Sequence, residues 1–337
     1  MLKVTSDITS IRNVAVIGSG LAGLSSAIIL GQMGHNVRVF EKSRGPGGRM
    51  SSKRVSDGSA DIGAQYFTVR NPNFLTFLHQ YAGASTFDTW SARFGFQDSD
   101  NIWQPFPQEN RYVGVPRMTA ITRALSAGID LVSEVRIERL VQAGEQWRLE
   151  CTEGKSHGLF DQVVITAPPA QAQDILMGSG LAELAAKLVS PVEQILPCWA
   201  VAAHFAQPPT DRFDAMRPNS DTLYWVANNS SKPGRDGSGQ WWVLHATPEW
   251  TKANVETAPD EVCAELLREF RSLTDHTGDP TETVAHRWLY ARSADADNPG
   301  YLLDQKKRIG LAGDWLAGGR VEGAWESATK LAAAMQS

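Results

Sequence analysis

The sequence predicts an α/β protein with two domains, one built on a parallel sheet and the other mostly antiparallel. Three observations favour this fold class. A short β-branched run leads directly into a glycine-rich turn and a helix-compatible stretch within the first 34 residues. A second strand pattern that ends in Gly-Asp, followed by a helical pattern, lies near the carboxy-terminus. Several strand patterns follow one another between these two regions, as is typical of antiparallel sheets.

Composition narrows the class of protein. A chain of 337 residues with 42% hydrophobic and 20% charged residues is expected to fold around a large core. The formal net charge of −5 argues against nucleic acid and anionic membranes as partners, because both attract basic surfaces. The three cysteines (Cys151, Cys198 and Cys263) have no Cys-x-x-Cys spacing, which indicates a reducing compartment and no metal site.

The amino-terminal region is not expected to direct the chain to a membrane. The residues up to Asn13 have no apolar core of the kind found in a signal peptide. Val14 to Gly34 carries no charge, but it contains five glycines, and its apolar run is far shorter than the roughly 20 residues a bilayer requires. We therefore expect a cytoplasmic protein.

The first predicted unit is a βαβ nucleotide-binding motif. A strand over Asn13 to Ile17 is followed by Gly18-Ser19-Gly20-Leu21-Ala22-Gly23 and a helix over Leu24 to Leu30. The first glycine allows a sharp turn, the second allows the backbone to approach a pyrophosphate, and the third allows close packing of helix and strand. The helix amino-terminus offers unpaired N–H groups to phosphates. We expect Gly18, Gly20, Leu21, Ala22 and Gly23 to bind a dinucleotide there.

An acid completes this motif. The second strand, Asn36 to Phe40, ends in Glu41, whose carboxylate can accept hydrogen bonds from both hydroxyls of an adenosine ribose. The same carboxylate would repel a 2′-phosphate, so NADP is disfavoured in this site. The motif predicts FAD or NAD and does not choose between them.

The following segment favours FAD. It runs Lys42-Ser43-Arg44-Gly45-Pro46-Gly47-Gly48-Arg49-Met50, and its glycines and proline exclude a continuous helix or strand. Such a loop can lie against a flat or anionic ligand, although a surface loop with solvated arginines is the alternative. The segment resembles the second glycine motif of the FAD-containing amine oxidases and related flavoproteins. The resemblance implies that Lys42, Arg44, Gly48, Arg49 and Met50 contact FAD.

Two later stretches extend this resemblance. Gln162 to Pro169 is similar to the strand that leads out of the FAD domain in that family. The strand that ends at Gly313-Asp314 resembles the motif whose aspartate holds the ribityl chain of FAD. Val321 to Met335 is predicted to be a closing helix, whose amino-terminal dipole favours the negative charge of reduced flavin. The residues implied as FAD contacts in these regions are Val135, Gly313, Asp314, Val321, Glu322 and Ala324.

A narrower resemblance is to the renalases, especially their bacterial members. It rests on the long strings Ala60 to Thr68, Tyr224 to Arg235, Trp241 to Trp250 and His286 to Ala291. It implies a p-hydroxybenzoate-hydroxylase-like arrangement of FAD and substrate domains, with Ala64, Gln65 and Tyr66 at the cofactor. It also implies oxidation of 2- or 6-dihydro isomers of NAD(P) to NAD(P)⁺ by hydride transfer to flavin N5, with O2 reduced to H2O2. No cysteine lies beyond Cys263, so we expect noncovalent FAD.

The predicted FAD domain is discontinuous. It comprises residues 10–80, 110–185 and 290–337, and the substrate domain comprises 81–109 and 186–289. Strands are predicted at Pro197 to Ala206, Thr222 to Asn228, Gln240 to Ala246 and Thr281 to Ala291, with a helix over Pro259 to Leu273. Asn229 to Gly239 is polar and rich in glycine and serine, so we expect a mobile loop at the edge of the substrate pocket.

The candidate catalytic residues are His245, Tyr224 and Asn228. His245 lies in an apolar strand, where it is either a core histidine with one backbone partner or a group that contacts substrate. The resemblance to renalases, in which a histidine of a matching string lies near the flavin, favours the second role. We hypothesise that the three residues hydrogen-bond the carboxamide or ribose of the substrate. Six of the eleven tryptophans fall between Trp199 and Trp288, where they fill the core or wall a slot for a planar ring.

Two other functions remain open from the sequence. The enzyme could be a flavin oxidase or desaturase acting on an amine or an apolar ring. It could also be a low-turnover flavin protein that acts as a redox sensor. Turnover with a defined electron donor separates the enzymes from the sensor, and the identity of the donor separates the two enzymes.

Overall fold

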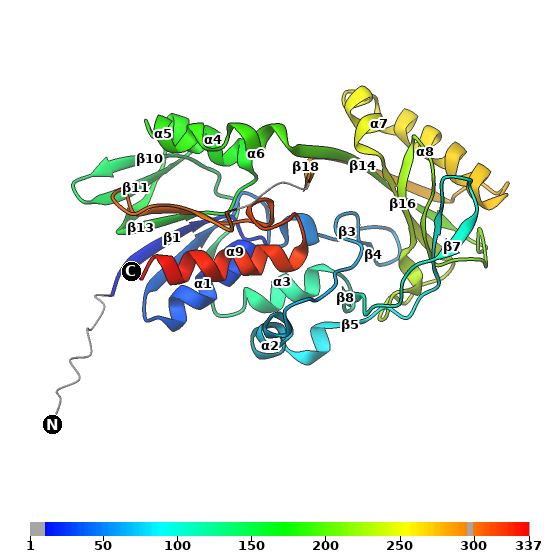
Figure 1. The fold of residues 1–337 in the computed structure, drawn as a ribbon, viewed down its shortest axis with the longest axis horizontal. Helices are drawn as coiled ribbons and strands as arrows, with labels where there is room; N and C mark the ends of the chain where they lie inside the picture. Colours follow the sequence, from blue (N-terminus) through cyan, green and yellow to red (C-terminus); the bar gives the residue numbers. More distant parts are fainter. Residues whose placement is uncertain (1–10, 295–298, 337) are drawn as a thin grey trace. The chain divides into compact units, whose positions relative to one another are not determined.

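The computed structural model describes residues 11–294 and 299–336, which form two compact units (Figure 1). Unit 1 contains the described residues 11–46, 126–193 and 299–336, and unit 2 contains Gly47–Leu125 and 194–294. Residues 1–10, for which a leader was not expected, lie outside the described residues.

Unit 1 is built on a six-stranded sheet in the order β19-β20-β13-β1-β2-β9. All neighbouring pairs are parallel except the edge pair β19–β20. The central strand β1 is buried along Val14 to Ile17, as expected of a strand in a parallel sheet. The strands are β1 (Asn13–Ile17), β2 (Asn36–Phe40), β9 (Asp130–Val132), β13 (Gln162–Ile165), β19 (Leu302–Asp304) and β20 (Ile309–Leu311).

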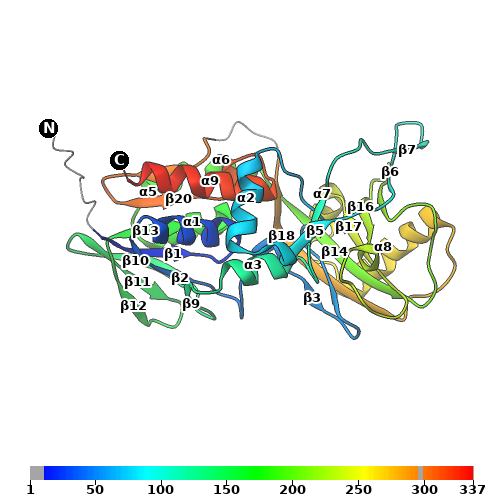
Figure 2. The ribbon, with the colours of Figure 1, turned by 90° about the horizontal axis from the view of Figure 1, so that it is seen from below.

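Two helices from opposite ends of the chain pack together on this sheet. Helix α1 (Leu21–Gln32) and helix α9 (Val321–Ala334) lie side by side in Figures 1 and 2. Leu30 of α1 and Leu331 of α9 share a core with Val14, Val39 and Val164 of the strands. The short helix η4 (Asp314–Leu316) leads into α9.

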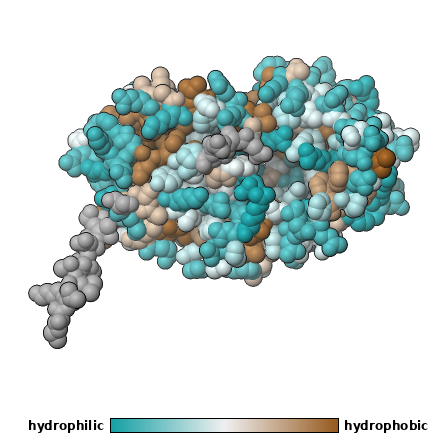
Figure 3. All heavy atoms as spheres, viewed as in Figure 1, coloured by the Kyte–Doolittle hydropathy of each residue, from teal (hydrophilic) through white to brown (hydrophobic). Residues whose placement is uncertain are grey.

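A smaller sheet and three helices complete unit 1. The antiparallel strands are β10 (Ile137–Ala143), β11 (Gln146–Cys151) and β12 (Ser156–Phe160), and the helices are α4 (Pro169–Gly178), α5 (Ala182–Ala186) and α6 (Val189–Glu193). In the view of Figure 3, hydrophobic side chains of unit 1 gather over the β19–β20 hairpin. Among the described residues no helix is long and apolar enough to span a bilayer.

Unit 2 is built on a seven-stranded sheet in the order β18-β14-β17-β16-β15-β6-β7, antiparallel except for β15–β6. Its strands are β6 (Phe94–Gln97), β7 (Trp103–Pro105), β14 (Ile195–Phe205), β15 (Ala215–Arg217), β16 (Leu223–Asn228), β17 (Gln240–Ala246) and β18 (Glu282–Ser293). The four long strands match the predicted strands within a few residues, and β17 has the predicted bounds.

The two faces of this sheet have different partners. Helix α8 (Pro259–Thr274) packs its Leu266 and Phe270 against Val201, Trp242 and Leu244 on one face. On the other face, Ala200 and Val243 contact Val55, Ala60 and Ile62. This second side carries His245 and is not covered by α8, and we call it the open face.

Several short elements surround the sheet of unit 2. The helices are η1 (Gly48–Met50), α2 (Pro72–Tyr81), η2 (Ala84–Thr86), α3 (Thr119–Leu125), η3 (Asn229–Ser231) and α7 (Pro248–Ala253), and the strand pairs are β3 (Lys53–Arg54) with β4 (Ser59–Ala60) and β5 (Phe87–Thr89) with β8 (Tyr112–Gly114).

The domain boundary differs from the predicted one. Residues 47–80 and 110–125 belong to unit 2, although the sequence placed them in the FAD domain. Their contacts explain the difference, because Ser52 bonds Asp61 and Thr119, and Asp61 bonds Lys232. The loop Asn229 to Gly239 was also expected to be mobile, but its Lys232 side chain is fully buried.

Candidate active site

The glycine turn after β1 fits a bound pyrophosphate. Gly18 has a φ of +103°, a conformation that side chains rarely allow. A Cβ at Gly23 would lie 1.9 Å from the Gly18 carbonyl oxygen, so only glycine permits this approach of helix to turn. Thr166 Oγ1 secures the turn by donating to the Ile17 carbonyl at 2.9 Å. The packing role that the sequence gave the third glycine is therefore visible in the structure.

The amino-terminus of α1 is open toward a ligand. Gly20 is the N-cap residue, and no side chain caps the helix. A Cβ added at Gly20 would meet no described atom within 4 Å. The first N–H groups of Leu21 and Ala22, together with the positive end of the helix dipole, are therefore available to phosphate oxygens.

Glu41 is held where the motif predicts. Its carboxylate is 7% exposed and accepts from Ser19 N at 2.9 Å, Ser19 Oγ at 2.7 Å and Ser43 N at 2.8 Å. A carboxylate offers about four lone-pair sites, so capacity remains for a ribose hydroxyl. Val135 lies beside it, because its N–H donates to the Glu41 carbonyl at 2.9 Å. The neighbouring Lys42 and Arg44 are exposed.

The carboxy-terminal motif supplies a second open helix end in unit 1. Asp314 and Glu322 are buried, and the Gly313 N–H donates to Ser327 Oγ at 2.9 Å. Helix α9 begins at Val321 without a side-chain cap among the described residues, and Ala324 is 8% exposed in its first turn. These features fit the FAD contacts implied by the sequence.

The remaining predicted FAD residues lie in unit 2. Gly48 has a φ of +51°, Met50 is buried, and the Arg49 carbonyl accepts from Ala64 N at 2.8 Å. A Cβ at Gly63 would lie 2.1 Å from that same carbonyl oxygen. The second glycine motif and the segment through Gln65 and Tyr66 are thus bound to each other, and their contact with FAD remains a prediction.

His245 uses one ring nitrogen in a hydrogen bond of the fold. Its Nε2 lies 3.0 Å from the Ile62 carbonyl oxygen, so Nε2 carries the proton and donates. Burial lowers the pKa of His245 to about 4, because the hydrogen bond to Ile62 only partly offsets desolvation and Lys232 and Arg292 also disfavour its charge. The ring is therefore neutral near pH 7, and Nδ1 is an acceptor with no partner among the described residues.

Tyr224 joins His245 on the open face. The guanidinium of Arg292 lies 4.2 Å from the Tyr224 ring centroid, and the same guanidinium lowers the pKa of His245. Strand β16 has a register shift between Leu223 and Trp225, so Tyr224 stands at a bulge beside Trp225, the residue that pairs with His245. Tyr224 is also close enough to raise the pKa of Tyr66, which packs on Trp225.

Asn228 does not join them, which corrects the predicted trio. It pairs with Trp242, whose side chain belongs to the core beneath α8, and side chains alternate along a strand. Its Oδ1 accepts from Ser230 N at 3.1 Å and caps η3. Asn228 therefore shapes the loop that follows β16.

The tryptophans of unit 2 lie in the cores on both faces of its sheet, and a slot for a planar ring remains a prediction. Trp199 and Trp242 fill the core beneath α8, and Trp241 belongs to the cluster on the open face. Trp225 packs against Tyr66, with ring centroids 5.4 Å apart, and its buried Nε1 has no partner among the described residues. Trp225 pairs with His245 across strands β16 and β17, so this aromatic pair lies next to His245.

A buried ion cluster anchors the open face, and the sequence did not predict it. Lys232 Nζ lies 3.2 Å from Asp61 Oδ2, and Arg235 lies 2.5 Å from the same oxygen. Burial would raise the pKa of Asp61, but the two cations outweigh it and hold the pKa below its usual range. Lys232 also donates to Gln65 Oε1 at 3.2 Å, and Gln65 donates to the Gly63 carbonyl at 3.0 Å. Asp61 is far in sequence from Lys232 and Arg235, so no local pattern could have revealed the cluster.

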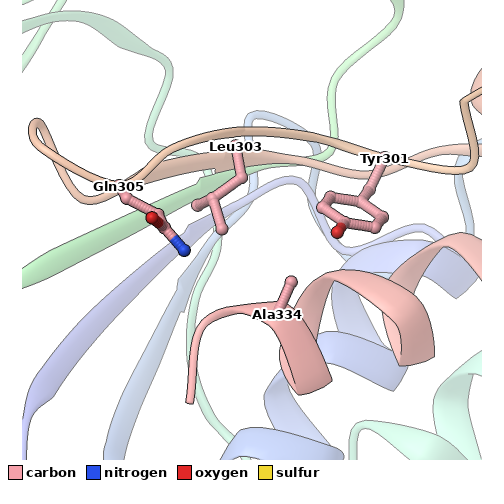
Figure 4. Close-up of a pocket in the computed structure, with 4 residues that line it drawn as sticks. All are labelled: Tyr301, Leu303, Gln305 and Ala334. Carbon is pink, nitrogen blue, oxygen red and sulfur yellow. The ribbon is translucent and has the colours of Figure 1, made fainter. Parts of the chain in front are cut away.

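One surface pocket lies elsewhere in unit 1. Its volume is about 340 Å³, and it is lined by Tyr301, Leu303 and Gln305 around β19 and by Ala334 at the end of α9 (Figure 4). It offers a phenol and an amide but no charged group. Within residues 11–294 and 299–336, no three His, Cys, Asp or Glu side chains are placed to hold a metal ion.

The uncapped helix ends, the glycine packing and the anchored Glu41 are the features of a Rossmann-like domain that binds a dinucleotide. Residues 16–81 match the NAD(P)-binding Rossmann-like domain, and residues 86–336 match the flavin containing amine oxidoreductase family. The chain therefore belongs to the flavin containing amine oxidoreductase family.

Individual relatives agree with this assignment. The chain is 34% identical over 92 residues to L-amino acid oxidase Cdc18 of Crotalus durissus cumanensis, covering 27% of this chain and 17% of that protein. It matches less than a fifth of the length of such curated relatives. Among solved structures it is similar to the cyclohexylamine oxidase of Brevibacterium oxydans IH-35A, with a TM-score of 0.72, 13% identity and coverage of 97% and 99% of the two chains. Putrescine oxidase bound to putrescine gives a TM-score of 0.70 with 12% identity, again over 97% and 99% of the chains.

Proposed function

We propose that the protein is a renalase-like oxidase that converts 2- or 6-dihydro isomers of NAD(P) to NAD(P)⁺. The observation that carries this proposal is the neutral His245, whose Nδ1 accepts while Nε2 is committed to the Ile62 carbonyl. A neutral acceptor suits a carboxamide N–H of a nicotinamide ring. A cationic amine substrate would gain less from it than from a carboxylate.

The surroundings of His245 support a planar substrate. Tyr66 and Trp225 lie against each other with centroids 5.4 Å apart, and Phe106 packs on Trp225 at 5.8 Å. Aromatic faces of this kind stack with a flat ring and exclude water from it. The unpartnered Trp225 Nε1 adds a hydrogen-bond donor to this apolar surface.

The chain itself supplies orientation. FAD, held by Gly20, Glu41 and Asp314, would supply the acceptor for the hydride, and O2 would be the oxidant that is reduced to H2O2. The open face holds the donor through His245 and the aromatic pair, so that its reacting carbon is fixed in one position. A dihydropyridine becomes an aromatic cation when it loses hydride, and this step requires no proton transfer to a side chain. The three free cysteines (Cys151, Cys198 and Cys263) fit the reducing cytoplasm that the sequence predicts.

Product analysis tests the proposal. The holoenzyme is incubated in air with 2-dihydro-NAD, 6-dihydro-NAD or a panel of primary and cyclic amines, and NAD⁺ and H2O2 are quantified. We expect equal amounts of NAD⁺ and H2O2 from at least one isomer. Peroxide formed only with amines would replace this function with amine oxidation, the alternative that the family favours. Bound flavin without turnover of any donor would favour the sensor.

The role of His245 has its own test. His245→Ala removes the Nδ1 acceptor, and the loss of one hydrogen bond to substrate is expected to lower kcat/KM for the isomer by about tenfold. FAD content should not change. His204→Ala is the matched control, because this histidine of β14 bonds Ser238 and Thr281 at another end of the sheet. Equal kcat/KM in wild type and His245→Ala would exclude His245 from substrate binding.

A further inference from the structure

Tyr224 lies between two arginines on the open face. Arg292 Cζ is 4.2 Å from its ring centroid and Arg217 Cζ is 5.4 Å from it. Arg292 belongs to β18, and Tyr224 belongs to β16, with β14 and β17 between these strands. The half-buried Arg292 side chain therefore reaches across two strands to stack on the tyrosine.

Arg292 has no acidic partner within the described part of the chain. Other arginines of unit 2 do: Arg287, on the same strand, pairs with Glu256 at 3.0 Å, and Arg93 pairs with Asp214 at 3.1 Å. Cys198 lies close to Arg292, but burial raises the pKa of this thiol to about 12, so the thiol stays neutral. A partly desolvated guanidinium without a counter-charge is costly, and an anionic ligand would offset that cost.

The stack also prepares Arg292 for a particular ligand. A guanidinium is planar and donates two parallel hydrogen bonds to the oxygens of a phosphate. Stacking on Tyr224 fixes the plane of the guanidinium while leaving its N–H edge available. Arg217 adds a second positive charge on the same ring. His245 is close enough for Arg292 to lower its pKa, so the cation and the Nδ1 acceptor can serve one ligand.

We propose that Arg292, stacked on Tyr224 and assisted by Arg217, binds phosphoryl oxygens of a dinucleotide substrate whose nicotinamide end lies at His245. This inference rests on the proposed function for the identity of the ligand. The subsite itself requires only an anion of the phosphate class. It selects nucleotides over nicotinamide compounds that lack phosphate.

The test measures ligand binding to the holoenzyme through perturbation of the flavin absorbance and by calorimetry. The ligands are NAD⁺, nicotinamide riboside and inorganic diphosphate. Each is measured with the wild type, with Arg292→Gln and with the control Arg287→Gln. Arg292→Gln removes a charge-assisted pair of hydrogen bonds. We therefore expect it to lower the affinities for NAD⁺ and diphosphate by about tenfold or more and to leave the affinity for nicotinamide riboside unchanged. Arg287→Gln changes none of the three affinities. Arg292→Lys should restore part of the diphosphate affinity.

The outcomes separate the subsite from the proposed function. Diphosphate affinity that is equal in wild type and Arg292→Gln would overturn the subsite, even if the isomers are oxidised. An equal loss of riboside and NAD⁺ affinity would also overturn it, because the residue would then act on the fold. Diphosphate binding that depends on Arg292, in an enzyme that oxidises no nicotinamide isomer, would support the subsite and reject the proposed function.

Discussion

Asp61→Asn is expected to lower the free energy of unfolding by about 3–5 kcal/mol, because it leaves two buried cations without their anion. Lys232 and Asp61 are both 0% exposed in their side chains, and Arg235 is 5% exposed. Asp61 also accepts from Ser52 Oγ at 2.6 Å and Met118 N at 3.0 Å, so an amide would disturb four interactions of the carboxylate at once. Chemical denaturation of the holoenzyme measures the change.

Matched variants assign this loss to the ion cluster. Asp57→Asn changes an exposed acid that bonds Ser238 N at 3.0 Å, and it should cost less than about 1 kcal/mol. Adding Lys232→Met to Asp61→Asn removes one orphaned charge and should restore part of the stability. If Asp61→Asn were as stable as wild type, the buried charges would not depend on one another.

The same cluster predicts a pH dependence. The pKa of Asp61 is held at about 2, below the 3.8 of the unfolded chain. Its stabilisation is therefore complete above pH 3.8 and is lost as the pH falls toward the folded pKa. Wild type should lose stability through this acidic range more steeply than Asp61→Asn.

Gly23→Ala is expected to abolish FAD retention. The added Cβ would lie 1.9 Å from the Gly18 carbonyl, which is backbone and cannot turn aside. Separating α1 from the turn costs about 1–3 kcal/mol or more and moves the N–H groups that receive the pyrophosphate. The purified variant should lack the yellow flavin band.

Two other glycines of the same region provide the controls. Gly31→Ala, in the last turn of α1, would meet no atom of the described residues within 4 Å and should stabilise the helix by about 0.5–1 kcal/mol with full FAD content. Gly20→Ala also meets no described atom, so it should preserve apoprotein stability while weakening FAD. Normal flavin content in Gly23→Ala would show that the cofactor does not depend on this close packing.

The sequence predicted unit 1 well because its evidence is local. The strand, glycines, helix and Glu41 follow one another within one βαβ length, and the steric reasons given for Gly18 and Gly23 hold in the structure. The closing helix was expected over Val321 to Met335 and is found over Val321–Ala334. Patterns of this kind require no knowledge of distant contacts.

Unit 2 was harder to predict because its site depends on long-range pairing. Asp61 and Lys232 are 171 residues apart, and nothing near either residue indicates an ion pair. The same contact draws residues 47–80 into unit 2 and overturns the predicted boundary. Asn228 was predicted to lie beside His245 for a different reason. Its position depends on its pairing with Trp242, which puts it on the α8 side of the sheet, and the neighbouring sequence does not reveal that pairing.

His245 shows how far the sequence could go. The sequence made His245 a candidate and left open whether it is a core histidine or a substrate contact. The structure gives Nε2 the backbone partner expected of a core histidine and leaves Nδ1 without a partner among the described residues. One imidazole can fill both roles, because its two nitrogens are distinct.

Anaerobic reduction of the flavin by defined donors tests the central claim most directly. The holoenzyme is mixed in a stopped-flow instrument with 2-dihydro-NAD, 6-dihydro-NAD, ordinary NADH or an amine, and the flavin band is followed without O2. We predict rapid bleaching with at least one of the two isomers, accompanied by one NAD⁺ per flavin, and none with amines. Bleaching by an amine with no response to either isomer would contradict the proposed function.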